Sequence, residues 1–175
     1  MNVPLETLVV GDFMSIDPVT ASEELSIVDA QDRMTFNEIR HLLVVRNGQL
    51  TGIVSAHDLG RVWSTDHRAR CDLTVRDAMT ARPYCCTPTT RVSEVARVLE
   101  RNRYGCAVVI DGDDVVGIFT TIDALRILRS LALGEHPQPK NPPASERHAS
   151  KASIVVQPML RFGPGVKTRG RVSRA

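Results

Sequence analysis

The sequence predicts an α/β (α+β) protein in which two β-α-β-β-α units pack as a pseudo-twofold pair, followed by a flexible C-terminal tail. Two observations lead to this prediction. When the chain is shifted by 65 residues, positions 8–64 align with 73–129 without a gap, and 11 of the 57 pairs are identical. In both copies, strand-like apolar runs and helix-like apolar spacing follow one another in the same order. Such repetition indicates a supersecondary unit that is duplicated and packs on itself.

The elements of the first copy follow from its apolar pattern. A short strand is predicted at residues 19–21. Ile27, Ala30 and Met34 fall near helical spacing, and Ser26 with Asp29 forms a capping box at the start of that helix. The remaining elements are a strand at 41–45, an Asn-Gly turn at 46–49, a strand at 50–55 and a helix at about 56–63.

The second copy repeats these elements. It has a strand at 84–86 and a helix whose apolar side is formed by Val92, Val95 and Leu99. Then follow a strand at 106–110, an Asp-Gly turn at 111–114, a strand at 115–120 and a helix at about 121–133. A sheet with helices on one face predicts a two-layer sandwich for each unit.

Three regions are therefore expected: residues 1–68 as unit 1, 69–134 as unit 2 and 135–175 as a basic, Pro-rich tail. Residues 1–134 contain 14 Arg, no Lys and 18 acidic residues, a balance of −4, whereas the tail contains 8 basic and 2 acidic residues, a balance of +6. This tail composition predicts disorder, so its removal should leave the melting temperature almost unchanged. If the apolar run at 154–160 packs as an added strand, removal should instead destabilise the protein.

Composition and motifs exclude several classes of function. No apolar run approaches the length of a membrane span and the N-terminus does not resemble a secretory signal, so we expect a cytoplasmic protein without a membrane partner. The four cysteines have no zinc-site spacing and are expected to be buried and reduced. There is no P-loop and no evident Ser–His–Asp or Cys–His set, so no catalytic residue, metal ligand or enzymatic activity is predicted.

A seven-residue phrase occurs twice, as GIVSAHD at 52–58 and GIFTTID at 117–123. Two interpretations stay open. The hydroxyl residue and the aspartate three positions later can form a capping box at the start of a helix. Alternatively, a helix that begins at the end of a strand offers backbone N–H groups to a phosphate, and its aspartate can accept hydrogen bonds from the two hydroxyls of a ribose.

Three repeated features together resemble the CBS domain family. They are a Met-x-x-x-Pro opening at 14–18 and 79–83, an apolar strand before a turn, and the repeated phrase at a strand–helix junction. Two such units in tandem resemble a Bateman module, the regulatory unit that binds adenosine nucleotides. The resemblance covers about residues 8–130.

The resemblance implies one nucleotide site for each copy. Asp58 and Asp123 would hold ribose, and Ser55 and Thr120 would face phosphate. Adenine would lie against the first strand of the unit, which means Thr20 and Ala21 in one copy and Cys85 and Cys86 in the other. Near the phosphate the first copy has Arg40, His41 and His57.

The second copy has Gly105 and Cys106 where the first has Arg40 and His41. We therefore expect the first site to bind phosphorylated ligands more tightly, because a charge-assisted hydrogen bond is stronger than a neutral one.

The resemblance thus implies a regulatory module that senses AMP, ADP, ATP or S-adenosylmethionine and signals occupancy to a regulated protein or through dimerisation. A homodimer and no obligatory cofactor are expected. The alternative is a CBS scaffold that binds no ligand and whose basic tail docks a protein or a nucleic acid. With Phe162 as the tail's one aromatic residue, stacking on bases is not favoured, and nucleic acid is the less favoured partner.

Overall fold

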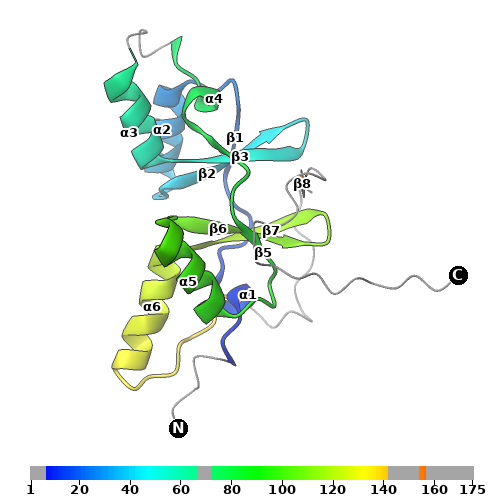
Figure 1. The fold of residues 1–175 in the computed structure, drawn as a ribbon, viewed down its shortest axis with the longest axis vertical. Coiled ribbons are helices and arrows are strands. Elements are labelled where there is room, and N and C mark those ends of the chain that lie inside the picture. The colour runs from blue at the N-terminus through cyan, green and yellow to red at the C-terminus, as the bar shows by residue number, and fades with distance from the viewer. Residues whose placement is uncertain (1–6, 67–71, 142–153, 157–175) are drawn as a thin grey trace, which may run out of the picture.

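The computed structural model describes residues 7–66, 72–141 and 154–156. Both copies have the predicted β-α-β-β-α order (Figure 1). The elements of the first copy are β1 (Thr20–Ser22), α2 (Ile27–Phe36), β2 (His41–Arg46), β3 (Gln49–Ser55) and α3 (Ala56–Thr65). Those of the second copy are β5 (Cys85–Cys86), α5 (Val92–Asn102), β6 (Cys106–Asp111), β7 (Asp114–Thr120) and α6 (Thr121–Ala132).

The repeat seen in the sequence extends to the backbone conformation. A left-handed φ occurs at three pairs of positions that are 65 residues apart: Asp17 and Arg82, Glu38 and Arg103, Asn47 and Gly112. The β2–β3 hairpin has an irregular register between Val44 and Val45, and the β6–β7 hairpin has one at the equivalent place, between Val109 and Ile110. The two copies therefore share their turns and bulges as well as their helices and strands.

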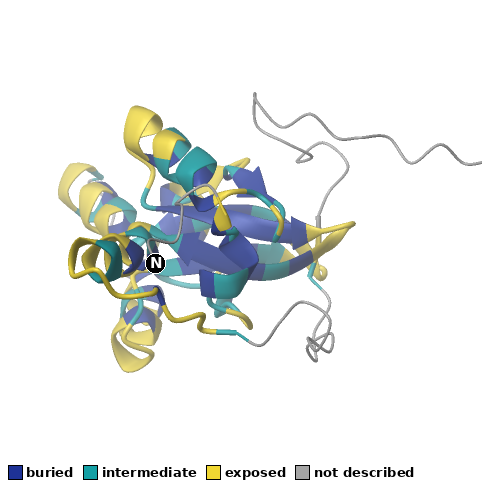
Figure 2. Cartoon of the chain, turned by 90° about the horizontal axis from the view of Figure 1, so that it is seen from below, coloured by how far each residue is buried: buried dark blue, intermediate teal, exposed yellow. Residues whose placement is uncertain are grey.

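Each copy contributes three neighbouring strands to the sheet, with helices on one face of them. β1 runs parallel to β2, which pairs antiparallel with β3, and the same arrangement holds for β5, β6 and β7. The other faces of the two sheets enclose a shared core that includes Leu43, Leu50, Val108 and Ile118. Figure 2 shows the strands buried and the outer sides of the helices exposed. The fold class predicted from the sequence is confirmed.

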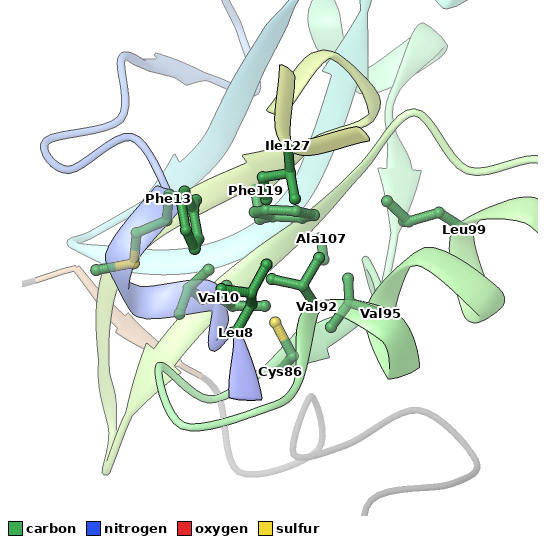
Figure 3. Packing of buried hydrophobic residues seen from close by; sticks show 12 residues of the cluster. Leu8, Val10, Phe13, Cys86, Val92, Val95, Leu99, Ala107, Phe119 and Ile127 are labelled. Carbon is green, nitrogen blue, oxygen red and sulfur yellow. The ribbon is translucent and has the colours of Figure 1, made fainter. Parts of the chain in front are cut away.

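The start of each repeat packs on the other unit. The segment 8–15 contains α1 (Val10–Phe13), and it contributes Leu8, Val10 and Phe13 to the core around Phe119 of unit 2 (Figure 3). The segment 73–80 contains α4 (Val75–Ala78) and contributes to the core beneath α2 and α3 of unit 1. The sequence did not predict this exchange. The proposed boundary between residues 68 and 69 lies outside the described residues.

The glycine of each repeated phrase lies where the exchanged segment crosses the sheet. A Cβ on Gly117 would come 2.7 Å from both the Sδ of Met14 and the carbonyl oxygen of Ser15. A Cβ on Gly52 would come 2.9 Å from the carbonyl oxygen of Thr80. Thr80 begins β4 (Thr80–Ala81), which pairs with β3. Glycine is therefore required at both positions because another backbone passes closely over it.

The described parts of the tail contact the rest of the chain. β8 (Val155–Val156) lies between β3 and β7, and Ile154 packs against the core between the sheets. The apolar run at 154–160 thus begins as an added strand, the alternative left open above. Residues 135–141 form neither helix nor strand, and they return from α6 towards α1. The remaining tail residues, including the basic end, lie outside the described residues.

Within the described ranges, none of the helices is both long and apolar enough to cross a membrane.

Candidate functional site

The repeated phrase forms a complete capping box in both copies. At the start of α3, the backbone N–H of Ser55 donates to Asp58 Oδ2 at 3.0 Å, its hydroxyl donates to the same oxygen at 2.6 Å, and the Asp58 N–H donates to Ser55 Oγ at 3.2 Å. At α6, Thr120 and Asp123 make the same three contacts, at 2.8, 2.7 and 3.3 Å. The capping interpretation of the sequence is confirmed at both sites.

Each cap uses only one oxygen of its carboxylate. Oδ1 of Asp58 lies 3.9 Å from the guanidinium of Arg61, which is one turn further along α3. Oδ1 of Asp123 lies 3.4 Å from Arg126 at the equivalent position, and it also accepts from the Nζ of Lys140. The Asp58 side chain remains 23% exposed, whereas that of Asp123 is 3% exposed. The two aspartates therefore have the same cap but different access to solvent.

Residues from both units surround Asp58. Arg40 is exposed next to the start of α3, where its carbonyl oxygen accepts from the N–H of Ala56 at 3.0 Å. The imidazole of His41 lies against Gly105, since a Cβ on that glycine would come 2.6 Å from Nε2. The Asp58 carboxylate acts electrostatically on Cys106 of unit 2. The first site is therefore built at the interface between the units.

The surroundings of His41 lower its pKa. Burial lowers the pKa of His41 below its usual value of 6.5, the Asp58 carboxylate acts in the opposite direction, and Arg40 adds to the lowering. The neutral ring, which can both donate and accept a hydrogen bond, is thereby favoured over the charged one. Arg40 and Arg61 are cations of this site at any physiological pH. His57, in the first turn of α3, is exposed.

The four residues predicted to lie against adenine do not form one surface. Thr20 pairs with Leu43 across β1 and β2, and its carbonyl oxygen accepts from Arg33 at 2.8 Å. Ala21 is buried in the core beneath α2 and α3. Cys86 is buried in the core of unit 2, and Cys85 in the core between the sheets. The structure thus gathers Arg40, His41, Ser55 and Asp58, and places the side chains of Ala21, Cys85 and Cys86 inside cores.

The second site adjoins a hollow of about 830 Å³ that is lined by α6, Phe13 and the segment 135–140. Its polar lining includes Asp123, Arg126 and Lys140. The sequence had not indicated Lys140 or the arginine one turn after each aspartate. The identity of Arg61 and Arg126 in the repeat was an available signal for the arginines. Lys140 lies outside the repeat, so no comparison of the copies could have found it.

The fold and its two capped aspartates define a paired repeat protein whose candidate sites lie where strands meet helices. The profile of the CBS domain matches residues 10–63 and 75–130. The chain belongs to the CBS domain family, and it contains two CBS domains in tandem.

The chain is similar to several known proteins, among them the following three. A homoserine O-acetyltransferase of Methanobrevibacter ruminantium is 32% identical over 132 residues, which are 74% of this chain but 26% of that protein. The structure of a putative acetoin utilization protein, AcuB, from Vibrio cholerae has a TM-score of 0.63 at 27% identity, covering 73% of this chain and 94% of that one.

The CBS domain pair of protein MJ0100, in complex with 5′-methylthioadenosine and S-adenosyl-L-methionine, has a TM-score of 0.65 at 26% identity and covers 71% of this chain and 98% of that one. The chain spans about a quarter of the length of the first curated relatives that it matches.

Proposed function

We propose that this chain is a regulatory module that binds an adenosyl ligand, with Asp58 and its surroundings as the principal site, and that it transmits occupancy to a second copy or to a regulated protein. The module has no chemistry of its own in this proposal. A ligand shifts the arrangement of such a pair only through its different affinity for the two arrangements.

The observation that carries the proposal is the unequal use of the two Asp58 oxygens. Oδ2 accepts both contacts from Ser55, while Oδ1 is directed to the more distant Arg61 in a partly exposed carboxylate. One oxygen can therefore maintain the helix cap while the other accepts a hydrogen bond from a ribose hydroxyl. Capping and ligand binding are compatible in one residue.

The ligand class follows from the groups around Asp58. The start of α3 and the exposed Arg40 favour a negatively charged group, such as the phosphate of AMP, ADP or ATP. The ligands of the MJ0100 pair support the broader class of adenosyl compounds, which includes S-adenosylmethionine. The Ser55 hydroxyl donates a hydrogen bond to Asp58. It must therefore rotate in order to donate to a phosphate instead. Thr20 and Ala21 would then meet the base through the backbone of β1.

A thermal-shift titration tests this proposal. AMP, ATP and S-adenosylmethionine are added to the wild type and to Asp58→Asn, whose amide oxygen can keep the cap while its NH₂ replaces Oδ1. A ligand at 100 times its dissociation constant should stabilise the wild type by about 2.7 kcal/mol, and this shift should be clearly smaller in Asp58→Asn.

The matched control is Asp29→Asn, which makes the same change in the cap of α2, where Asp29 Oδ2 accepts from Ser26 at 2.7 Å. This control should retain the full shift. Equal shifts in all three proteins would remove Asp58 from the proposed site.

A second copy of the chain is the proposed partner of α6. Ile122, Leu125 and Leu128 are 46%, 57% and 60% exposed on successive turns of this helix. A contiguous apolar surface of this kind is typical of a protein interface. Sedimentation should show a homodimer that Leu125→Glu combined with Leu128→Glu converts to monomer. Phe36→Glu, at a residue that is 89% exposed on α2, should leave the dimer intact.

A further inference from the structure

We propose that residues 135–141, here called the latch, occupy the Asp123 site with Lys140, so that the second site of the pair binds a ligand only when the latch is displaced. This inference rests on the proposed function, because it concerns the access of the same class of ligand to the second aspartate. In this proposal the latch makes Asp123 less accessible to a ligand than Asp58.

Lys140 takes the position at Asp123 that a ligand would need. Its Nζ donates to Oδ1, the oxygen that the cap leaves unused, and lies 3.4 Å from the hydroxyl of Ser15. Arg126 lies on the same Oδ1 at 3.4 Å. With two cations on this oxygen and Thr120 on the other, the carboxylate is 97% buried without being left unpaired. A ribose hydroxyl must therefore compete with an ammonium group for Oδ1.

The latch is held by the end of α1 as well as by Asp123. The backbone N–H of Lys140 donates to the carbonyl oxygen of Asp12 at 2.8 Å. The Asn141 side chain donates to the carbonyl oxygens of Gly11 and Met14, at 3.0 and 2.8 Å. The last carbonyls of a helix have no partner within it, so these bonds satisfy acceptors that would otherwise need water. Several polar contacts thus fix Lys140 in place.

The latch also closes one side of the hollow beside α6. Pro137 is buried, and it lines this hollow together with Phe13 and Ile127. Its proline ring packs without the need to satisfy a backbone N–H. The segment is therefore buried at Pro137 in its middle and held by hydrogen bonds at its end.

The first site has no such occupant within the described residues. After α3 the chain leads to Asp66 and, from residue 72, to α4 on unit 1. Asp58 keeps 23% exposure, and its nearest cation, Arg61, is 3.9 Å away. Lys140 follows the second copy at a position beyond the end of the repeat, so this difference in access to the aspartate arises from the tail.

A built-in occupant lowers the apparent affinity of a site by the fraction of molecules in which the site is open. If the latch is closed in nine molecules of ten, the second site binds about ten-fold more weakly than it would without Lys140. Conversely, a ligand that fills the second site must release the latch. Occupancy of that site is thereby linked to the position of the tail.

Calorimetry with AMP and S-adenosylmethionine on the full chain tests this. In the Asp58→Asn background, only the Asp123 site should report. Adding Lys140→Met should strengthen binding at least ten-fold, while Lys151→Met, which removes the same charge from the same tail, should leave it unchanged. Equal affinity with and without Lys140→Met would overturn the inference.

Hydrogen exchange separates failure of the latch from failure of the proposed function. The amide of Lys140 should be protected in the wild type and should exchange at least ten-fold faster in Asp123→Asn, with or without any ligand. Fast exchange in both proteins would overturn the latch. If neither ligand binds any variant, the proposed function and the competition at Asp123 both fail. Protection of the Lys140 amide would still show whether the latch is closed.

Discussion

The imidazole of His41 occupies the space where a side chain at position 105 would lie, with Nε2 2.6 Å from a Cβ built on Gly105. In the repeat, Gly105 corresponds to Arg40, an exposed cation next to the start of α3. Because position 105 has no side chain, the imidazole of His41 from the first copy can occupy this space. The glycine at 105 thus permits the contact between the units, and it is also the residue on which the expectation of a weaker second phosphate site rests.

This contact predicts a pH dependence of stability. Because burial lowers the folded-state pKa of His41 below 6.5, the unfolded state takes up a proton first as the pH falls. The free energy of unfolding should decrease as the pH falls from about 7.5 through 6.5 towards the folded pKa, and urea unfolding measures it. His41→Gln should show a smaller decrease over this range, since the carboxylates contribute equally to both proteins. Identical pH profiles would contradict a buried neutral His41.

The two crossing glycines predict a second result. Gly117→Ala and Gly52→Ala should each reduce the free energy of unfolding by about 1–3 kcal/mol, because the new methyl group must displace another backbone. Gly60→Ala is the control, since nothing lies within 4 Å of its Cβ on α3, and it should stabilise the helix by about 1 kcal/mol. Denaturant unfolding of the three variants distinguishes these effects. A neutral Gly117→Ala would mean that the segment 8–15 does not cross there.

The third prediction concerns removal of the tail. The contacts of the tail predict a loss of stability, whereas its composition predicted almost no change in the melting temperature. The N–H of Val155 donates to the carbonyl oxygen of Gly48, and the N–H of Val115 to that of Ile154, both at 2.8 Å. Truncation after residue 141 should cost about 1–3 kcal/mol, from these bonds and the burial of Ile154. Since about 2–4 °C accompanies each kcal/mol in a chain of this size, calorimetry should show a clear decrease in the melting temperature. Truncation after residue 134 should lower it further, and unchanged values would favour the composition-based prediction.

The cysteines provide a fourth prediction. Burial raises the pKa of Cys85 to about 11 and those of Cys86 and Cys106 to about 12, and the charge of Asp58 adds to the effect at Cys106. Their thiolates are therefore scarce at pH 8, and the three thiols should react with iodoacetamide only as fast as the protein unfolds. Cys71 lies outside the described residues, so Cys71→Ser is the background for this experiment. Rapid labelling of the folded protein would instead indicate an accessible thiol.

The local elements were predictable from the sequence, since each depends on residues close in the chain. The apolar spacing of Ile27, Ala30 and Met34 and the turn at Asn47 specify one helix and one hairpin without reference to the rest of the molecule. The capping boxes at Asp58 and Asp123 are equally local, because the two residues of each box are only three positions apart. The expected burial of the cysteines is also confirmed for Cys85, Cys86 and Cys106.

The contacts between distant segments could not be predicted in this way. A four-residue helix such as α1 is too short to show a periodic apolar pattern, and an internal repeat does not indicate which copy a segment will pack on. Lys140 and Asp123 meet because the chain reverses after α6, in a stretch whose Pro-rich composition predicted no fixed structure. His41 and Gly105 meet only after the two sheets have packed. The sequence therefore predicted the two units but not how they complete one another.

The exchange of the segments 8–15 and 73–80 has a consequence for how the pair can be divided. A cut at the repeat boundary would give two fragments, each carrying the piece that completes the core of the other and lacking its own. Neither fragment should fold alone, but a mixture of the two should reconstitute the protein by fragment complementation. The same interlocking makes unfolding a single cooperative transition. Because each repeat begins with the segment that packs on the other unit, the two copies complete their cores only as a pair.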